Sequence, residues 1–194
     1  MAPPPATVHL MHWNTALFQH MHATAASPHW AIAAAIVIAQ WALWAILALV
    51  VWHLARQRSG VAALRIVGAW FVSNRIEALV SAFAFHPRPF AVGYGPAWIE
   101  HAANNSMPSS HVVLALILLF ALARQQHFRS AALAAVLTAA LAWARIYIGI
   151  HWPVDMLGAV ASAAVSVGLV AAVERTVGLL RKTIHKRLHP VHAT

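Results

Sequence analysis

The stretch AIAAAIVIAQWALWAILALVVWHL, residues 31–54, decides the fold class of this chain. It holds no formally charged side chain. As a helix rising about 1.5 Å per residue it would reach roughly 36 Å, whereas the hydrocarbon core of a bilayer is about 30 Å thick. Because a backbone in hydrocarbon must satisfy its own hydrogen bonds, the stretch predicts a membrane-spanning helix.

Four further apolar stretches follow the first one, at residues 66–85, 108–123, 130–148 and 156–173. The whole chain is 61% hydrophobic and only 9% charged, which excludes an ordinary soluble domain. We therefore expect an all-α, polytopic membrane bundle of five spans. We further expect one membrane domain over residues 1–194, with mobile tails at residues 1–5 and from about residue 182 to residue 194.

Residues 6–27 are too polar to span well, yet their apolar side chains recur at near-helical spacing. These side chains are Leu10, Trp13, Leu17, Phe18 and Met21. Such a pattern is typical of a helix that lies in the membrane interface. The alternative is a sixth, poor span, and the sequence leaves both open.

Basic residues outnumber acidic ones by 13 to 4, giving a formal charge of +9. In a soluble protein this excess would suggest nucleic acid, but here it gathers at alternate ends of the spans, so we expect no nucleic-acid partner. Ten of the basic residues follow the first, third and fifth spans: Arg56, Arg58, Arg65, Arg124, Arg129, Arg175, Arg181, Lys182, Lys186 and Arg187. These ends are predicted to be cytoplasmic, which puts the loop of residues 86–107 and the turn at His151 together outside.

Three short motifs fall on that outer side: HPRPF at residues 86–90, PSSH at residues 108–111, and Arg145 followed by His151 and Asp155. Arg88 and Arg145 carry planar, permanently charged groups that suit phosphate oxygens. Proline is favoured as a first helical residue, so we expect Pro108 to begin a helix. The free N–H groups of its first turn would attract an anion.

His151 precedes Asp155, the only aspartate of the chain, by four residues. A carboxylate within reach of an imidazole can hold its tautomer and stabilise the cation formed when the ring attacks. Since the chain has fourteen histidines, such a pair could arise by chance. The neighbouring arginines and the PSSH motif make a catalytic pair the preferred interpretation.

Together and in this order, the three motifs resemble the signature of the type 2 phosphatidic acid phosphatase superfamily, whose membrane members are six-helix lipid phosphatases. The resemblance implies that His151 attacks phosphorus to form a phosphohistidine, that Asp155 orients it, and that His111 protonates the leaving group. It implies phosphate-binding roles for Arg88, Ser109, Ser110 and Arg145. It calls for no metal and no cofactor.

The outer loop, including the stretch EHAANNSMPSSH at residues 100–111, resembles bacterial undecaprenyl-diphosphatases of the bacitracin-resistance type. This resemblance implies a multi-pass protein of the bacterial inner membrane, which acts on undecaprenyl diphosphate from the periplasmic or outer side. Glu100 and His101 would then contact the second phosphate, unless they only shape the loop.

Several alternatives stay open at this point. Phosphatidate, phosphatidylglycerol phosphate or lipid A could be the substrate, and a phosphotransferase would use an acceptor in place of water. A non-enzymatic membrane protein could instead bind metal or haem through the many histidines. The sequence does not determine the oligomeric state.

The chain departs from the family pattern at three positions. Ser81 stands where the family usually has a phosphate-binding lysine, Ala144 where it has a serine, and Ser110 where glycine is common. The second span also contains Arg75 and Glu77, and each charge costs roughly 2.5 to 3.5 kcal/mol in a membrane helix, so both should face protein or water.

Overall fold

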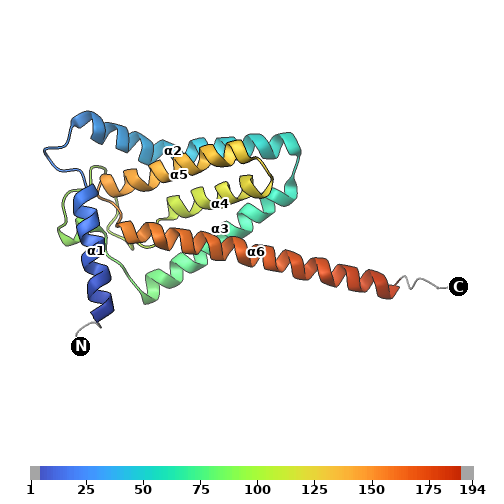
Figure 1. Cartoon of the computed structure of the whole chain (residues 1–194). Helices are drawn as coiled ribbons and strands as arrows, with labels where there is room; N and C mark the ends of the chain where they lie inside the picture. The colour runs from blue at the N-terminus through green and yellow to red at the C-terminus, as the bar shows by residue number, and fades with distance from the viewer. Residues whose placement is uncertain (1–4, 189–194) are drawn as a thin grey trace.

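A computed structural model describes residues 5–188. These residues form six α-helices and one short 3-10 helix, and no strand occurs among them (Figure 1). The elements are α1 (Pro5–Met21), α2 (His29–Gln57), α3 (Gly60–Phe83), η1 (Pro89–Val92), α4 (Ser110–Arg124), α5 (Phe128–Tyr147) and α6 (Pro153–Leu188). The predicted all-α class is confirmed.

Helices α2 to α6 form the bundle, and within residues 5–188 four of them, α2, α3, α5 and α6, are long and apolar enough to cross a membrane. The shorter apolar helix α4 has 15 residues, or about 22 Å of helix. Helix α4 is thus shorter than the hydrocarbon core is thick, and the segment of residues 84–109 leads into it. The bundle therefore holds irregular polar backbone at one end, where side chains from other helices can enclose it.

Several helix ends differ from the bounds predicted for the spans. Helix α3 begins at Gly60 and not at residue 66, because the Ser59 hydroxyl accepts a hydrogen bond from the Ala62 N–H at 3.3 Å and caps the helix. Helix α4 begins at Ser110 and not at Pro108. Helix α6 continues to Leu188, where we expected a mobile tail from about residue 182. Residues 1–4 and 189–194 of the predicted tails lie outside the described residues.

Helix α1 crosses the end of the bundle and does not run along the other helices (Figure 1). It is not among the helices that are long and apolar enough to span. Phe18 of α1 is fully buried against Trp152, and the Asn14 side-chain oxygen accepts a hydrogen bond from the Val154 N–H at 2.9 Å. These contacts attach α1 to the start of α6, and the interfacial position of residues 6–27 stays a prediction.

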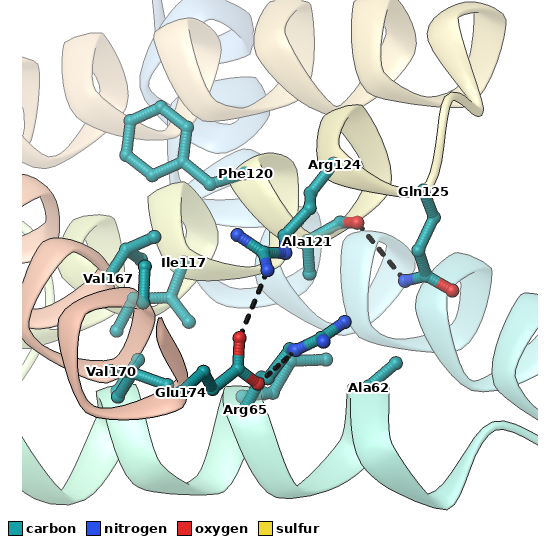
Figure 2. Close-up of a pocket in the computed structure, with 13 residues that line it drawn as sticks. Ala62, Arg65, Ile117, Phe120, Ala121, Arg124, Gln125, Val167, Val170 and Glu174 are labelled. Carbon is teal, nitrogen blue, oxygen red and sulfur yellow. Dashed lines mark hydrogen bonds and ion pairs between the residues drawn. The ribbon is translucent and has the colours of Figure 1, made fainter. Parts of the chain in front are cut away.

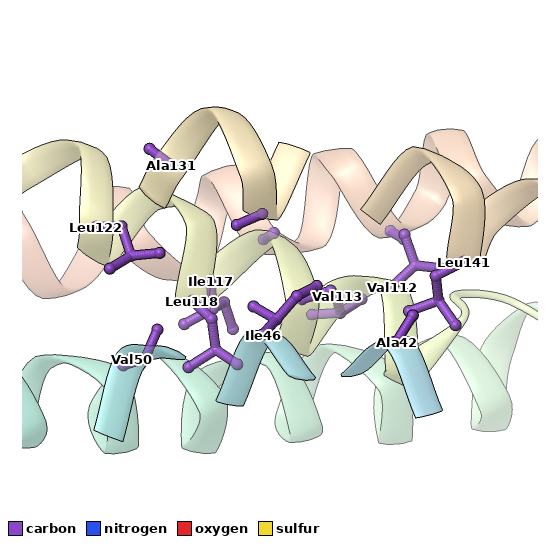
Figure 3. Close-up of a cluster of buried hydrophobic side chains, with 14 of the residues drawn as sticks. Ala42, Ile46, Val50, Val112, Val113, Ile117, Leu118, Leu122, Ala131 and Leu141 are labelled. Carbon is purple, nitrogen blue, oxygen red and sulfur yellow. The ribbon is translucent and has the colours of Figure 1, made fainter. Parts of the chain in front are cut away.

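The core lies where α2, α4 and α5 meet (Figure 3). The buried face of α2 repeats every three or four residues, through Ala35, Ala39, Ala42, Ile46 and Val50. Lipid tails are as apolar as these side chains, so helix association in a membrane depends on close van der Waals packing, which small residues permit. The alanines of α2 thus explain how α5 can pack closely beside it.

A charged cluster joins three helices, as Figure 2 shows. It lies at the start of α3 and the end of α4, away from the turn before α6 that carries His151. Glu174 of α6 accepts hydrogen bonds from Arg65 of α3 and from Arg124 of α4, the second at 3.0 Å. The cluster lies beside a small pocket of about 40 Å³, lined mainly by apolar side chains. It fixes the relative positions of α3, α4 and α6 at the end that the sequence predicts to be cytoplasmic.

Candidate active site

The three motifs meet at one end of the bundle, although nearly seventy positions separate the first from the last. The loop after α3 carries Arg88, the start of α4 carries Ser109, the end of α5 carries Arg145, and the turn into α6 carries His151 and Asp155. All five side chains are buried. Buried charges cluster in this way only where they serve one another or a ligand.

The turn between α5 and α6 aims His151 at Asp155. Gly149 has a φ of +82°, and a side chain on it would meet the Pro96 carbonyl oxygen at 2.5 Å, so the turn requires glycine. His151 Nδ1 then lies 3.1 Å from Asp155 Oδ2, and the Trp152 N–H donates to the same oxygen at 2.8 Å. The four-residue spacing therefore produces the contact that the sequence predicted.

Two more donors reach the Asp155 carboxylate, which is completely buried. The Ser106 hydroxyl donates to Oδ2, and the His86 ring donates through Nδ1 to Oδ1 at 3.1 Å. Four donors in all surround the two oxygens. Because hydrogen bonding to the charged form favours that form, Asp155 is held as a carboxylate.

Two arginines surround the other ring nitrogen of His151. Arg88 Nη1 lies 3.2 Å and Arg145 Nη2 lies 3.4 Å from His151 Nε2. A guanidinium has donors and no acceptor, so both contacts require that Nε2 carries a lone pair and no proton. The carboxylate at Nδ1 requires the proton there, and the two requirements select the same tautomer.

The electrostatics of the turn keep His151 neutral. Burial lowers the pKa of its imidazole from 6.5 to about 3, and the charges of Arg145 and Arg88 act in the same direction, whereas the bond to Asp155 opposes them. At neutral pH the Nε2 lone pair is therefore available to attack an electrophile.

Arg88 is fixed by the loop that precedes α4. Its Nε donates to Asn104 Oδ1 at 2.9 Å, Nη1 donates to the Ile150 carbonyl at 2.7 Å, and Nη2 donates to the Asn105 carbonyl at 3.1 Å. Burial lowers the pKa of Arg88, and the charges of Asp155 and Glu77 oppose this shift. An arginine remains protonated even so, and Arg88 is a preorganised cation.

Two buried polar atoms beside these groups have no hydrogen-bond partner among the described residues: Arg145 Nε and Ser109 Oγ. Most buried polar groups are satisfied, so these two atoms need an explanation, and a bound ligand would supply one. Both atoms can donate, and one belongs to a cation. The arrangement suits a bound anion next to His151 Nε2.

Ser110, at the start of α4, has a partner inside the protein. Its hydroxyl donates to the carboxylate oxygens of Glu77 at 2.8 Å, and its role as a phosphate ligand stays a prediction. His111 in the same turn is exposed and lies within electrostatic reach of Arg145, His101 and Arg88. It can therefore meet a group that approaches the site from outside.

Residues 62–178, more than half of the chain, match the PAP2 superfamily. The chain belongs to the PAP2 superfamily. This PAP2 protein is 35% identical over 149 residues to the putative undecaprenyl-diphosphatase YbjG of Escherichia coli, a match that covers 75% of this chain and 74% of YbjG. It is also 34% identical over 86 residues to the undecaprenyl-diphosphatase BcrC of Bacillus subtilis, covering 43% of this chain and 42% of BcrC.

Two solved structures share the fold of this PAP2 protein. Aquifex aeolicus LpxE superimposes with a TM-score of 0.69 at 15% identity, covering 82% of this chain and 95% of LpxE. The PAP2-type phosphatidylglycerolphosphate phosphatase of Bacillus subtilis gives a TM-score of 0.65 at 14% identity, with 87% of each chain covered. The family match and the two relatives, together with the apolar helices, show that the chain is a multi-pass membrane lipid phosphatase whose partners are a lipid phosphate and the bilayer.

A polar cavity of about 400 Å³ opens beside the site of this PAP2 phosphatase, between α3 and the loop before α4. Ser81, which replaces the family lysine, lines it together with Arg75 and Glu77. The guanidinium of Arg75 lies 5.5 Å from the Phe71 ring centroid. The two charges in the second span therefore face a polar cavity, as the cost of burying them in lipid requires.

The two residues predicted to contact the second phosphate in this PAP2 phosphatase, His101 and Glu100, differ in their distance from His151 or in their exposure. The His101 ring centroid is 6.4 Å from that of His151, and burial lowers the pKa of His101, so this ring is close to the site and neutral at neutral pH. Glu100 is exposed.

Among residues 5–188, no three His, Asp or Glu side chains converge as a metal site would require.

Four residues at the site of this PAP2 phosphatase were not predicted from the sequence: His86, Asn104, Asn105 and Ser106. His86 lies two positions before Arg88 in a motif that was recognised, and the other three lie in the quoted loop. Their polar side chains, close to the motifs, were the available signal. Their partners could not be assigned, because they lie 16 to 69 positions away.

Proposed function

We propose that this protein hydrolyses undecaprenyl diphosphate to undecaprenyl phosphate and inorganic phosphate through a phosphohistidine on His151. One observation carries the proposal: the unprotonated Nε2 of His151 lies between two arginine side chains, while Asp155 holds the proton on Nδ1. A nucleophile surrounded by fixed cations suits attack on an electron-rich phosphorus.

In the first step, Nε2 forms a bond to the terminal phosphorus and the bond from phosphorus to the bridging oxygen breaks. Arg88 and Arg145 neutralise the charge that spreads over the phosphoryl oxygens, and Ser109 Oγ adds a donor. The imidazole becomes a cation, which the Asp155 carboxylate stabilises.

We assign the two proton transfers of this reaction to His111. Its exposed ring, protonated when the anionic substrate is bound, gives a proton to the bridging oxygen as undecaprenyl phosphate leaves. The neutral ring then takes a proton from the water that attacks the phosphohistidine. That attack cleaves the bond from nitrogen to phosphorus, releases inorganic phosphate and restores His151. Glu100 and His101 remain candidates for the second phosphate.

The substrate is inferred from two relatives that are named undecaprenyl-diphosphatases, YbjG and BcrC. Acting at the periplasmic or outer face of the bacterial inner membrane agrees with the basic residues gathered at the other end of the bundle. The likeness to LpxE and to the phosphatidylglycerolphosphate phosphatase concerns the fold alone, so phosphatidylglycerol phosphate and lipid A enter the test as competing substrates.

The test is release of inorganic phosphate from undecaprenyl diphosphate and from phosphatidylglycerol phosphate in detergent with EDTA, by wild type and by His151→Ala. His127→Ala is the matched control, because His127 stacks on His53 at the other end of the bundle. We expect turnover of the prenyl diphosphate by wild type and by the control, and a loss of at least about 10³-fold in His151→Ala.

Faster release from phosphatidylglycerol phosphate would reassign the substrate. Turnover by His151→Ala at the wild-type rate would remove His151 as the nucleophile. Product formed only when an alcohol acceptor is added would make the protein a phosphotransferase.

A further inference from the structure

His86 contacts the same carboxylate as His151, from the opposite oxygen. His86 Nδ1 lies 3.1 Å from Asp155 Oδ1, and His151 Nδ1 lies 3.1 Å from Asp155 Oδ2. The carboxylate is completely buried, and the side chain of His86 is 18% exposed. Asp155 thus lies between two imidazoles, only one of which carries the proposed nucleophile.

The donors to Asp155 are unevenly divided. The His151 ring, the Ser106 hydroxyl and the Trp152 N–H all reach Oδ2, whereas the His86 ring reaches Oδ1. A carboxylate free to rotate could exchange its two oxygens or turn away from His151. The hydrogen bond from His86 opposes this rotation, because the His86 N–H would lose its acceptor if Oδ1 moved away.

The backbone places the His86 ring firmly. The backbone N–H of His86 donates to Asn105 Oδ1 at 2.8 Å, and the backbone carbonyl of His86 accepts from the Ser106 N–H at 2.8 Å. The ring also lies near Trp152, with centroids 6.1 Å apart, and the indole N–H of Trp152 donates to the Pro87 carbonyl at 2.8 Å. Hydrogen bonds therefore fix the backbone N–H and carbonyl of His86 and the carbonyl of Pro87.

We infer that His86 is a positioning residue of the phosphatase: it donates a hydrogen bond from Nδ1 to Asp155 and thereby fixes the carboxylate that orients His151. His86 acts through Asp155 and does not touch the substrate. The inference rests on the proposed function, in which the tautomer and orientation of His151 decide the rate. An ionised carboxylate only accepts hydrogen bonds, so the His86 ring must carry its proton on Nδ1.

Two substitutions separate donation from packing. In His86→Asn the amide nitrogen takes the place of Nδ1 and can still donate to Asp155, but the ring is lost. In His86→Phe the ring remains beside Trp152, but the donor is lost. A positioning role predicts that Asn preserves kcat within about threefold and that Phe lowers it about tenfold to a hundredfold at unchanged KM. A packing role predicts the reverse order.

The experiment measures kcat and KM for undecaprenyl diphosphate in wild type, His86→Asn, His86→Phe and His151→Ala, with thermal unfolding of each in the same detergent. His86→Phe as fast as wild type, or His86→Asn as slow as His86→Phe, would overturn the inference. Wild type that releases no phosphate would instead overturn the proposed function.

A second readout does not depend on activity. Nitrogen-15 NMR of histidine-labelled protein reports which ring nitrogen carries the proton, and the His86 signals are those that disappear in His86→Asn. We expect protonation at Nδ1 of His86. A ring protonated only at Nε2 cannot donate to Asp155 and would refute the inference even if the substrate remained unknown.

Discussion

The substitution Asp155→Asn tests the electrostatics of the site with almost no change of shape. Three donors reach Oδ2 and one reaches Oδ1, so the single oxygen of the asparagine side chain should take the place of Oδ2. His151 then keeps a hydrogen bond at Nδ1 and loses the negative charge behind it. The amide nitrogen takes the place of Oδ1 and faces His86 Nδ1, so the His86 ring must move its proton to Nε2. The substitution therefore removes the charge and keeps the shape of the side chain.

The magnitude follows from the distance between the two groups. His151 Nδ1 lies 3.1 Å from Asp155 Oδ2. The charge on a phosphorylated imidazole is spread over the ring, so the two unit charges lie about 5 Å apart, which at an effective dielectric constant of about 20 gives roughly 3 kcal/mol. Since about 1.4 kcal/mol is a factor of ten, kcat should fall by roughly two orders of magnitude.

The assay is release of inorganic phosphate at saturating undecaprenyl diphosphate, with Ser106→Ala as the control. Ser106→Ala removes one neutral donor to Asp155 and leaves the charge, so its kcat should fall less than about tenfold. If Asp155→Asn kept kcat within about threefold of wild type while remaining folded, the carboxylate would not stabilise the transition state, and the role assigned to Asp155 would be wrong.

Three other predictions concern the cations, the serine and the pH. Arg145→Lys keeps a charge but loses the planar group whose Nε has no partner, so kcat/KM for the lipid should fall roughly tenfold to a hundredfold; an unchanged value would show that Arg145 does not bind phosphate. Ser109→Ala removes a buried hydroxyl without a partner, so Tm measured without substrate should not fall, while KM should rise; a lower Tm would assign the hydroxyl to folding. The pKa of His151 is lowered from 6.5 to about 3, so between these pH values the unfolded chain binds a proton that the folded chain does not bind. The stability of the folded protein should therefore be lost as the pH falls from about 6.5 toward 3. In His151→Asn the Tm should decline less steeply over this range, and equal slopes would contradict the burial of a neutral ring.

The sequence by itself determined the spans and the family. Residues 31–54 had to be a membrane helix, because an uncharged run of that length allows few other solutions. The His151 and Asp155 pair was equally readable, since residues four positions apart at the start of a helix lie within reach of one another. In each case the interaction is local, and its partners are close in the chain.

Helix ends were harder to place than helices. Helix α3 begins six residues before the predicted start, because the early turn contains Arg65, which hydropathy excludes from a span. In the folded chain Arg65 bonds to Glu174 of α6, 109 positions away. A charged residue that is paired with a residue far away in the chain can lie inside a helix, so it does not mark the end of that helix. The sequence does not show which residue it pairs with.

Only the tertiary structure decided which polar side chains meet at the candidate site. Ser110 has the residue type and the position of a phosphate ligand, yet Glu77 holds its hydroxyl. His86 has no role assigned from the sequence, yet its ring contacts Asp155, which lies 69 positions away in the chain. Hydrogen-bond partners between helices are set by how α3, α4 and α6 pack, and that packing depends on many weak contacts that no short motif encodes.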